Sequence, residues 1–157
     1  MIQKLQRPGP VGPCTETAAM IAHAQAFTVS MHQLHLKITG PGSLSVHKAL
    51  GEFYEGLPGL IDSVAEQYQG AREKLLEYPT VAPYKCGSVQ EALSHMKELY
   101  AEINNLQKLM TFSEVTNQLD EIKAKLCRNE SRLIALEEGN RDSRILWDDA
   151  RESADRT

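Results

Sequence analysis

Two histidines and two carboxylates lie in one stretch of the chain at spacings that suit metal binding. His35 and His47 stand on either side of a Gly-Pro-Gly turn, and Asp62 and Glu66 follow, four residues apart, in a helical pattern. Imidazole nitrogens and carboxylate oxygens together favour borderline metals such as Fe(II), Zn(II) and Mn(II). Without the histidines, a solvated acidic turn would be the simpler interpretation of Asp62 and Glu66. The two histidines favour a metal site.

The spacing of these residues requires a second copy of the chain. His47 and Asp62 are fifteen residues apart, so on one continuous helix they lie roughly 22 Å apart along the axis. One ion cannot contact both within a subunit, because bonds from such metals to nitrogen and oxygen ligands are roughly 2 Å long. If all four residues bind one centre, antiparallel copies of this helix must share it, which indicates a two-fold dimer.

The same stretch resembles the Dps family, the ferritin-like mini-ferritins known as DNA-binding proteins of starved cells, and in particular the small Dps-like proteins that bacteriophages encode. The family pattern is a histidine, a Gly-Pro turn, a second histidine twelve residues after the first, and Asp-x-x-x-Glu fifteen residues after the second. This chain has the pattern at those offsets, with His35, Gly40-Pro41, His47, Asp62 and Glu66. The resemblance is specific over about residues 31–70 and only architectural elsewhere.

One position departs from the family pattern. The family has an aspartate four residues after the second histidine, and this chain has Gly51 there. Glu52 lies beside it and Glu55 follows one turn later. The departure predicts that one iron position is weak or vacant unless one of these two glutamates fills it.

The resemblance implies an iron-binding protein with ferroxidase activity. His35 and His47 would bind iron from one subunit and Asp62 and Glu66 from the other, with Glu66 bridging a di-metal centre at which Fe(II) becomes Fe(III). It also implies a homo-oligomer, a two-fold dimer that assembles into a dodecamer, and iron storage if the dimers close into a hollow shell. If a bacteriophage encodes the chain, the host cytoplasm or the virion is its expected location.

An alternative belongs to another functional class. The chain would then be a ferritin-like structural or virion-associated scaffold protein whose metal site has decayed. Gly51, Pro58 and a charged C-terminal tail favour this alternative, whereas four ligands at the family spacing oppose it. Metal analysis after an iron soak would distinguish the two.

Composition restricts the class of protein further. A chain of 157 residues fits one domain and is long enough to bury a substantial core. Its formal net charge of −4 gives no overall basic field for nucleic acid. With neither a long apolar run nor a signal-peptide pattern, we expect a cytoplasmic protein without membrane contact. The three widely spaced cysteines form neither a disulfide framework nor a zinc-finger pattern.

The hydrophobic pattern predicts the elements that position these residues. Apolar residues recur at intervals of three and four, as in the series Val46, Leu50, Phe53 and Leu57, and predict four helices. The expected fold is all-α: a ferritin-like up-down four-helix bundle with a long crossover between the second and third helices. The bundle would span residues 15–139.

Two segments flank the predicted bundle. Residues 1–14 should form an irregular N-terminal arm whose side-chain cations are Lys4 and Arg7. Two cations predict weak DNA binding at most, since affinity rises with the number of phosphates neutralised. Residues 140–157 form a charged C-terminal extension in which Trp147 indicates either a docking contact or a disordered tail.

Capping residues predict where the helices begin and end. The expected N-caps are Thr15, either Ser43 or Ser45, and Ser88, the last in a capping box with Glu91. We expect Gly139 to be the C-cap of the fourth helix and Pro58 to bend the second. A short helix is expected at residues 72–77.

Two further histidines sit at helical spacing from polar partners. His95 and Glu98 form a His-x-x-Glu pair, the reverse of the order that ferritin-like di-iron sites use. For this pair we prefer a solvated helix face over a metal site. For His32, one turn before His35, we prefer a partly exposed polar residue.

Overall fold

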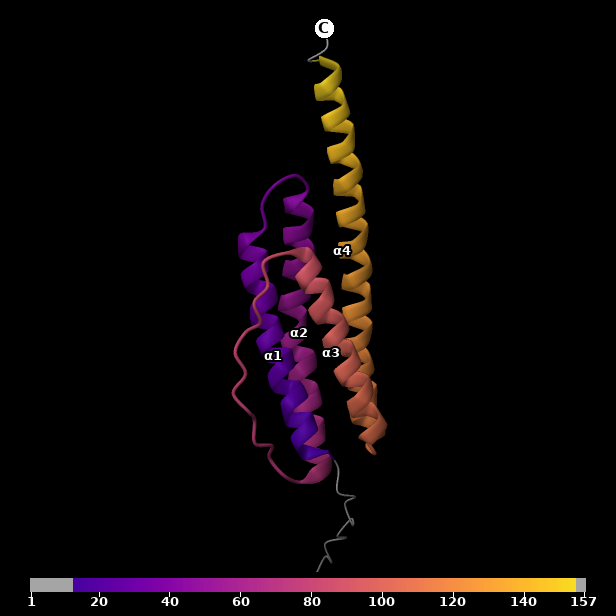
Figure 1. The fold of residues 1–157 in the computed structure, drawn as a ribbon. Helices are drawn as coiled ribbons and strands as arrows, with labels where there is room; N and C mark the ends of the chain where they lie inside the picture. The colour runs from indigo at the N-terminus through magenta and orange to yellow at the C-terminus, as the bar shows by residue number, and fades with distance from the viewer. Residues whose placement is uncertain (1–12, 155–157) are drawn as a thin grey trace, which may run out of the picture.

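The computed structural model of the protein describes residues 13–154, with side chains to residue 141. This part of the chain contains four helices and no strand (Figure 1), namely α1 (Cys14–Lys37), α2 (Ser43–Arg72), α3 (Val89–Leu109) and α4 (Ser113–Ala154). The prediction of an all-α four-helix bundle is confirmed. Lys4 and Arg7 of the predicted arm, and the side chain of Trp147, lie outside the described part.

Each helix contacts two others around a four-sided bundle. Helix α1 packs against α2 and α3, and α4 packs against the same two helices. Thus α1 and α4 occupy opposite corners, as do α2 and α3. The hairpin of α1 and α2 is antiparallel, whereas α2 and α3 run in the same direction (Figure 1).

The segment between α2 and α3 follows α1 from one end of the bundle towards the other (Figure 1). Its first part, residues 74–79, lies over the start of α1. Further on, the backbone N–H of Tyr84 donates to the hydroxyl of Ser30, with 2.7 Å between nitrogen and oxygen. This route brings the chain back to the end from which α3 can run parallel to α2.

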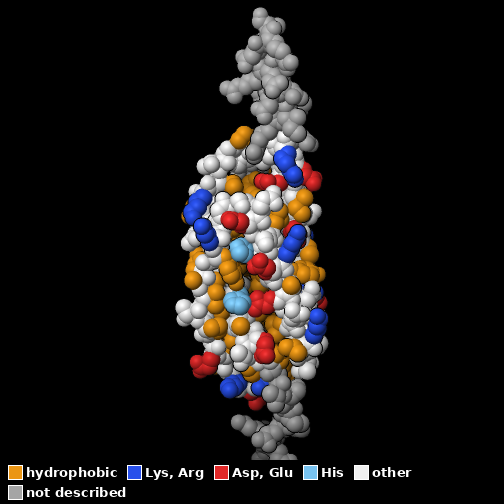
Figure 2. Space-filling model, viewed as in Figure 1, with side chains coloured by type: hydrophobic (Ala, Val, Ile, Leu, Met, Phe, Trp, Pro, Cys, Tyr) orange, Lys and Arg blue, Asp and Glu red, His pale blue; other side chains and the backbone are white. Residues whose placement is uncertain are grey.

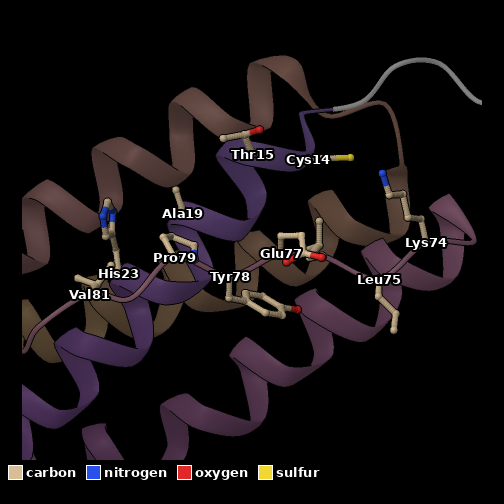
Figure 3. A pocket seen from close by; sticks show the side chains of 11 residues that line it. Cys14, Thr15, Ala19, His23, Lys74, Leu75, Glu77, Tyr78, Pro79 and Val81 are labelled. Carbon is tan, nitrogen blue, oxygen red and sulfur yellow. The ribbon is translucent and has the colours of Figure 1, made fainter.

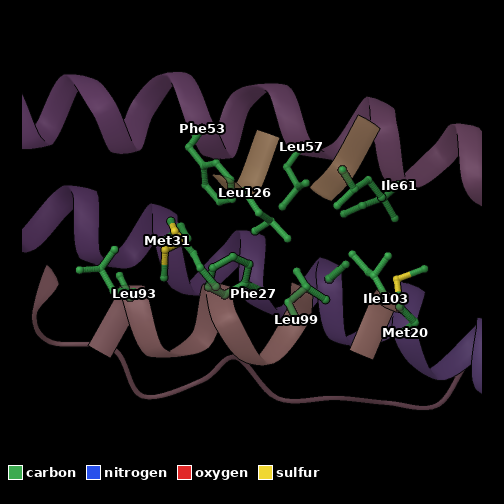
Figure 4. Close-up of a cluster of buried hydrophobic side chains, with 14 of the residues drawn as sticks. Met20, Phe27, Met31, Phe53, Leu57, Ile61, Leu93, Leu99, Ile103 and Leu126 are labelled. Carbon is green, nitrogen blue, oxygen red and sulfur yellow. The ribbon is translucent and has the colours of Figure 1, made fainter. Parts of the chain in front are cut away.

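Apolar side chains from all four helices fill the interior (Figure 4). Phe27 of α1 and Phe53 of α2 meet edge to face near its middle, with ring centroids 5.8 Å apart. Both are almost fully buried, as the periodicity predicts for residues on the inner stripe of each helix. The polar stripe of α2 that carries His47 and Asp62 is left on the outside.

Of the three predicted N-caps, one agrees with the structure and two differ. The Oγ of Ser88 accepts a hydrogen bond from the N–H of Glu91, so this N-cap is confirmed. Helix α1 begins at Cys14, one residue before the predicted cap Thr15. Helix α2 is preceded by Gly42, with φ of 73°, and not by a serine cap. Instead of forming a short helix at residues 72–77, the chain leaves α2 through Glu73 in the left-handed region and stays non-helical to residue 88.

Helices α2 and α4 both continue through residues at which a bend or an end was predicted. Helix α4 passes through Gly139 and is 42 residues long, so the predicted C-cap is wrong. Its C-terminal part extends beyond the other three helices (Figure 1). Helix α2 likewise continues through Pro58, which is exposed. His47 and Asp62 therefore do lie on one unbroken helix.

The buried aromatic contact gives a test of this core. We expect Phe27→Ala to lower the free energy of unfolding by about 3–5 kcal/mol, because it removes a large buried ring and leaves a cavity. Val29→Ala, at a position 44% exposed on the same helix, should change it by less than about 1 kcal/mol. Urea denaturation measures both, and equal effects of the two substitutions would contradict this core.

Candidate metal centre

The hairpin between α1 and α2 brings His35 and His47 together. His35 lies in the last turn of α1 and His47 in the second turn of α2. Gly40 and Gly42 have φ of 92° and 73°, a region that favours glycine, so the tight turn depends on them. The two imidazole rings stack with centroids 3.5 Å apart and planes inclined by 25°.

Each ring is bonded to the backbone of the other residue. The Nδ1 of His35 lies 2.8 Å from the carbonyl oxygen of His47, and the Nδ1 of His47 lies 2.9 Å from the carbonyl oxygen of His35. A carbonyl oxygen only accepts hydrogen bonds, so both Nδ1 atoms must donate and carry a proton. In the neutral ring this leaves the lone pair on Nε2.

This arrangement is common among histidine metal ligands. Such a ligand usually donates its other ring N–H to a carbonyl or carboxylate, which fixes the tautomer and the orientation of the ring. Here the same bonds also satisfy the carbonyl of His35, which lies in the last turn of α1 where intrahelical donors run out. His35 and His47 thus offer two oriented Nε2 atoms.

Gly51 faces this pair directly. A Cβ atom at this position would lie 3.3 Å from Cε1 and 3.5 Å from Nδ1 of His35. Any side chain there would therefore move the ring by a few tenths of an ångström. The one departure from the Dps-like pattern is thus a residue whose missing side chain leaves room for the histidine pair.

Neither nearby glutamate replaces the missing aspartate. Glu52 points towards α4 and forms an ion pair with Arg132, and this contact lowers the pKa of its carboxyl group. Glu55 is exposed and accepts a hydrogen bond from Tyr54, with 3.5 Å between the oxygens. The carboxylate position therefore stays unfilled within the subunit.

Two further rings, those of Tyr54 and His32, lie beside the histidine pair. The ring of Tyr54 meets His35 edge-on, with centroids 5.2 Å apart. His32 is exposed, as expected, and stacks on Tyr54 with centroids 4.3 Å apart and planes inclined by 16°.

Asp62 and Glu66 are exposed and are not brought to the histidines of the same chain. Asp62 lines a shallow cavity of about 180 Å³ together with Gln25, Thr28, Pro58 and Ile61. Within residues 13–141, whose side chains are described, no three histidine, cysteine or carboxylate groups are placed to hold a metal ion. A complete four-ligand centre therefore needs a second chain.

A second group of histidines and carboxylates lies between α1 and α3. Its lining residues enclose a cavity of about 230 Å³, and they are His23, Phe27, Tyr84, His95, Glu98, Leu99 and Glu102. Figure 2 shows histidine and acidic side chains side by side on the face that carries α3. The Nδ1 of His23 lies 2.8 Å from a carboxylate oxygen of Glu102, a pair that sequence analysis missed because the two residues are far apart in the chain. His95 is half-buried and stacks on Tyr84, whereas Glu98 is exposed, so the preferred solvated face agrees with Glu98 and only in part with His95.

A cavity of about 740 Å³ lies between the start of α1 and the segment that follows α2 (Figure 3). Cys14 lies at its edge, and its Sγ is 3.5 Å from the hydroxyl oxygen of Tyr68, which donates to it. This hydrogen bond, together with the charges of Arg72 and Lys74, lowers the pKa of the Cys14 thiol against the opposing effect of burial. Cys86, by contrast, is buried and has a raised pKa.

The contrast between these thiols predicts a pH dependence. Because a lowered pKa means that thiolate forms at a lower pH, alkylation of Cys14 should reach its half-maximal rate at a lower pH than that of a free cysteine peptide. Tyr68→Phe should move this midpoint upward. Iodoacetamide labelling followed by peptide mass spectrometry measures it, and an unchanged midpoint in Tyr68→Phe would contradict the role of the hydrogen bond.

The hydrogen bonds of the histidine pair predict its tautomers. In metal-free protein at alkaline pH, the neutral rings of His35 and His47 should both carry their proton on Nδ1. Long-range ¹H–¹⁵N spectra distinguish the tautomers. His32, which makes no backbone hydrogen bond among the described contacts, provides the internal reference. An Nε2–H signal from either His35 or His47 would refute the arrangement.

The position of Gly51 predicts the effect of restoring a carboxylate. Gly51→Asp and Gly51→Asn crowd the ring of His35 to a similar extent, but only aspartate adds a negatively charged carboxylate ligand. We expect Fe(II) to bind Gly51→Asp about tenfold more tightly than Gly51→Asn, a change typical of one altered group around a metal. Equilibrium dialysis measures both affinities, and equal values would show that position 51 does not face the metal.

Comparison with known proteins places the chain in a family whose function is unknown. The model of a family of unknown function, DUF5856, matches residues 40–130, and the chain belongs to this family. The match includes His47, Asp62 and Glu66 but begins after His35. No curated protein matches the chain, and neither does any solved structure. None of the helices in residues 13–154 has the length and apolar character needed to cross a membrane.

Proposed function

We propose that this member of the DUF5856 family binds Fe(II) at a centre shared by two copies of the chain. His35 and His47 of one copy and Asp62 and Glu66 of the other provide the ligands. Iron is the substrate, and its oxidation to Fe(III) makes the protein a ferroxidase of the Dps-like type. The supporting observation is the pair of reciprocal hydrogen bonds that leaves the Nε2 atoms of both histidines available.

The exposed carboxylates supply the second half of the proposed centre. Asp62 and Glu66 lie one turn apart on the outer stripe of α2, and both are accessible to a partner. Antiparallel pairing of two α2 helices about a two-fold axis would place this turn of one copy beside His47 of the other. Such pairing gives two equivalent centres per dimer.

Apolar groups on the same side support a protein interface. Val29 is 44% exposed and Leu36 is 69% exposed. At helical spacing they lie on the same face of α1 as His32, beside the outer stripe of α2. A dimer that covers this face would bury both side chains, and it is the first step of the proposed assembly into a dodecamer.

The course of the chain supports a ferritin-like bundle. Helices α2 and α3 run in the same direction, and the long segment between them follows α1 (Figure 1). Ferritin-like folds contain one long crossover of this kind. We therefore extend the proposal to a ferritin-like fold, in which iron is stored only if the dimers close into a shell.

The proposed residues divide the chemical tasks between nitrogen and oxygen ligands. Neutral imidazole binds Fe(II), and carboxylates offset the extra positive charge of Fe(III), which prefers hard oxygen ligands. Glu66 has two oxygens with which to bridge two ions. Each iron gives up one electron to an oxidant of the oxygen or peroxide class. With glycine at position 51, one of the two iron positions has fewer ligands and binds more weakly.

One observation favours the second candidate, a structural scaffold whose metal site has decayed. The C-terminal part of α4 projects beyond the bundle (Figure 1), which the iron-binding proposal does not use. A projecting helix offers a surface for another protein, as a virion-associated scaffold would need. The scaffold candidate predicts no stoichiometric iron binding at His35 and His47.

Mixed dimers test the shared centre. Single variants His47→Ala and Asp62→Ala should each lose metal, because every site then lacks one ligand. In heterodimers of the two, one site inherits both lesions and the other inherits neither. About half of the sites should therefore bind Fe(II) as in the unmodified protein, by counting over the two-fold axis. Differently tagged subunits isolate the heterodimer, and bound metal is then measured.

A matched control separates this result from general complementation. Heterodimers of His35→Ala with His47→Ala carry one lesion in the histidine half of every site, so they should recover no binding. Recovery in the first pair and none in the control supports the shared centre. Absence of recovery in the first pair would rule it out.

A further inference from the structure

A small basic cavity lies between α2 and α4, lined from α2 by Glu52 and Phe53 and from α4 by Lys125, Arg128, Asn129 and Arg132. Its volume is about 230 Å³. The three cations stand at positions i, i+3 and i+7 of α4, so they share one face of that helix. The cavity is built from residues that the proposed iron centre does not use.

Positive charge in the cavity exceeds negative charge. Glu52 provides the one carboxylate of its lining, and Arg132 pairs with it. Lys125 and Arg128 have no carboxylate partner among the ion pairs of the described residues. This local excess contrasts with the whole chain, whose formal net charge is −4.

Lys125 is held in place although it lacks an acidic partner. Its Nζ donates to the backbone oxygen of Glu52 over 3.1 Å and lies 5.7 Å from the centre of the Phe53 ring. Burial and the nearby charge of Arg128 lower the pKa of Lys125. An anion in the cavity would stabilise the charged form of Lys125 and offset the repulsion from Arg128.

Gly56 makes this position of Lys125 possible. A Cβ atom at residue 56 would lie 2.5 Å from Nζ and 3.2 Å from Cε of Lys125. The ammonium group therefore rests against the backbone of α2 in the space that a side chain would occupy. Alanine at this position would displace the flexible end of the lysine rather than the helix.

We propose that this cavity binds a compact oxyanion of the phosphate type, either inorganic phosphate or a terminal phosphate group. Two arginines and a lysine are the side chains that recognise phosphate oxygens through charge-assisted hydrogen bonds. The concave shape suits one compact group, whereas an extended polyanion such as DNA requires many cations along a track.

Calorimetric titration with inorganic phosphate tests this site on the full-length protein. Sodium chloride holds the ionic strength constant, which removes general screening effects. We expect saturable binding of one phosphate per chain. Arg128→Gln removes an exposed charge without disturbing the core and should weaken binding about tenfold, the loss expected for a charge-assisted hydrogen bond.

Two further variants make the result specific. Gly56→Ala keeps every charge and favours the helix, yet it should also weaken phosphate binding because it displaces Lys125. Lys108→Gln removes one exposed charge from α3 and should leave the affinity unchanged. An equal loss in Lys108→Gln and Arg128→Gln, or no saturable binding at matched ionic strength, would overturn the proposal. Retention of duplex DNA under the same conditions without phosphate binding would also overturn it, in favour of a nucleic-acid contact.

Discussion

The reciprocal bonds between His35 and His47 are the interaction on which the proposed chemistry depends. They join the end of α1 to the start of α2, satisfy a carbonyl in the last turn of α1, and place a proton on each Nδ1 atom. The turn needs glycine at two left-handed positions, and the stacked rings need glycine again at position 51. The contacts that tie the two helices together are therefore the same ones that orient the two imidazole rings proposed to bind metal.

The helical geometry then decides how many chains a metal centre requires. Helix α2 continues unbroken from Ser43 to Arg72, so His47 and Asp62 stay roughly 22 Å apart along its axis. The rise of the continuous helix fixes this separation, and burial of the inner stripe of α2 against the other helices leaves the stripe with His47 and Asp62 outside. In the proposed centre, one subunit would position the histidines and the other would present the carboxylates.

Local pattern predicts the helices well because burial of one face imposes the period of three to four residues. The Ser88 cap was equally predictable, since its partner Glu91 is three residues away. The predicted C-cap at Gly139 was wrong because a glycine ends a helix only where the chain turns away, and here α4 continues. Two contacts depend on packing between helices that are distant in the sequence, so no local spacing could reveal them. They are the ion pair of Glu52 with Arg132 and the contact between His23 and Glu102. The spacing of His35 and His47 predicted their proximity, but not the bonds that set their tautomers.

The most direct test of the shared centre is anomalous X-ray scattering at the iron edge from crystals soaked with Fe(II). Iron at an interface between two copies should give a peak within roughly 2–2.5 Å of an Nε2 atom of His35 or His47 and of a carboxylate oxygen from the second copy, the usual range of metal–ligand bonds. A peak bound only by residues of one chain, or no peak at the histidine pair in crystals that contain iron elsewhere, would contradict the account.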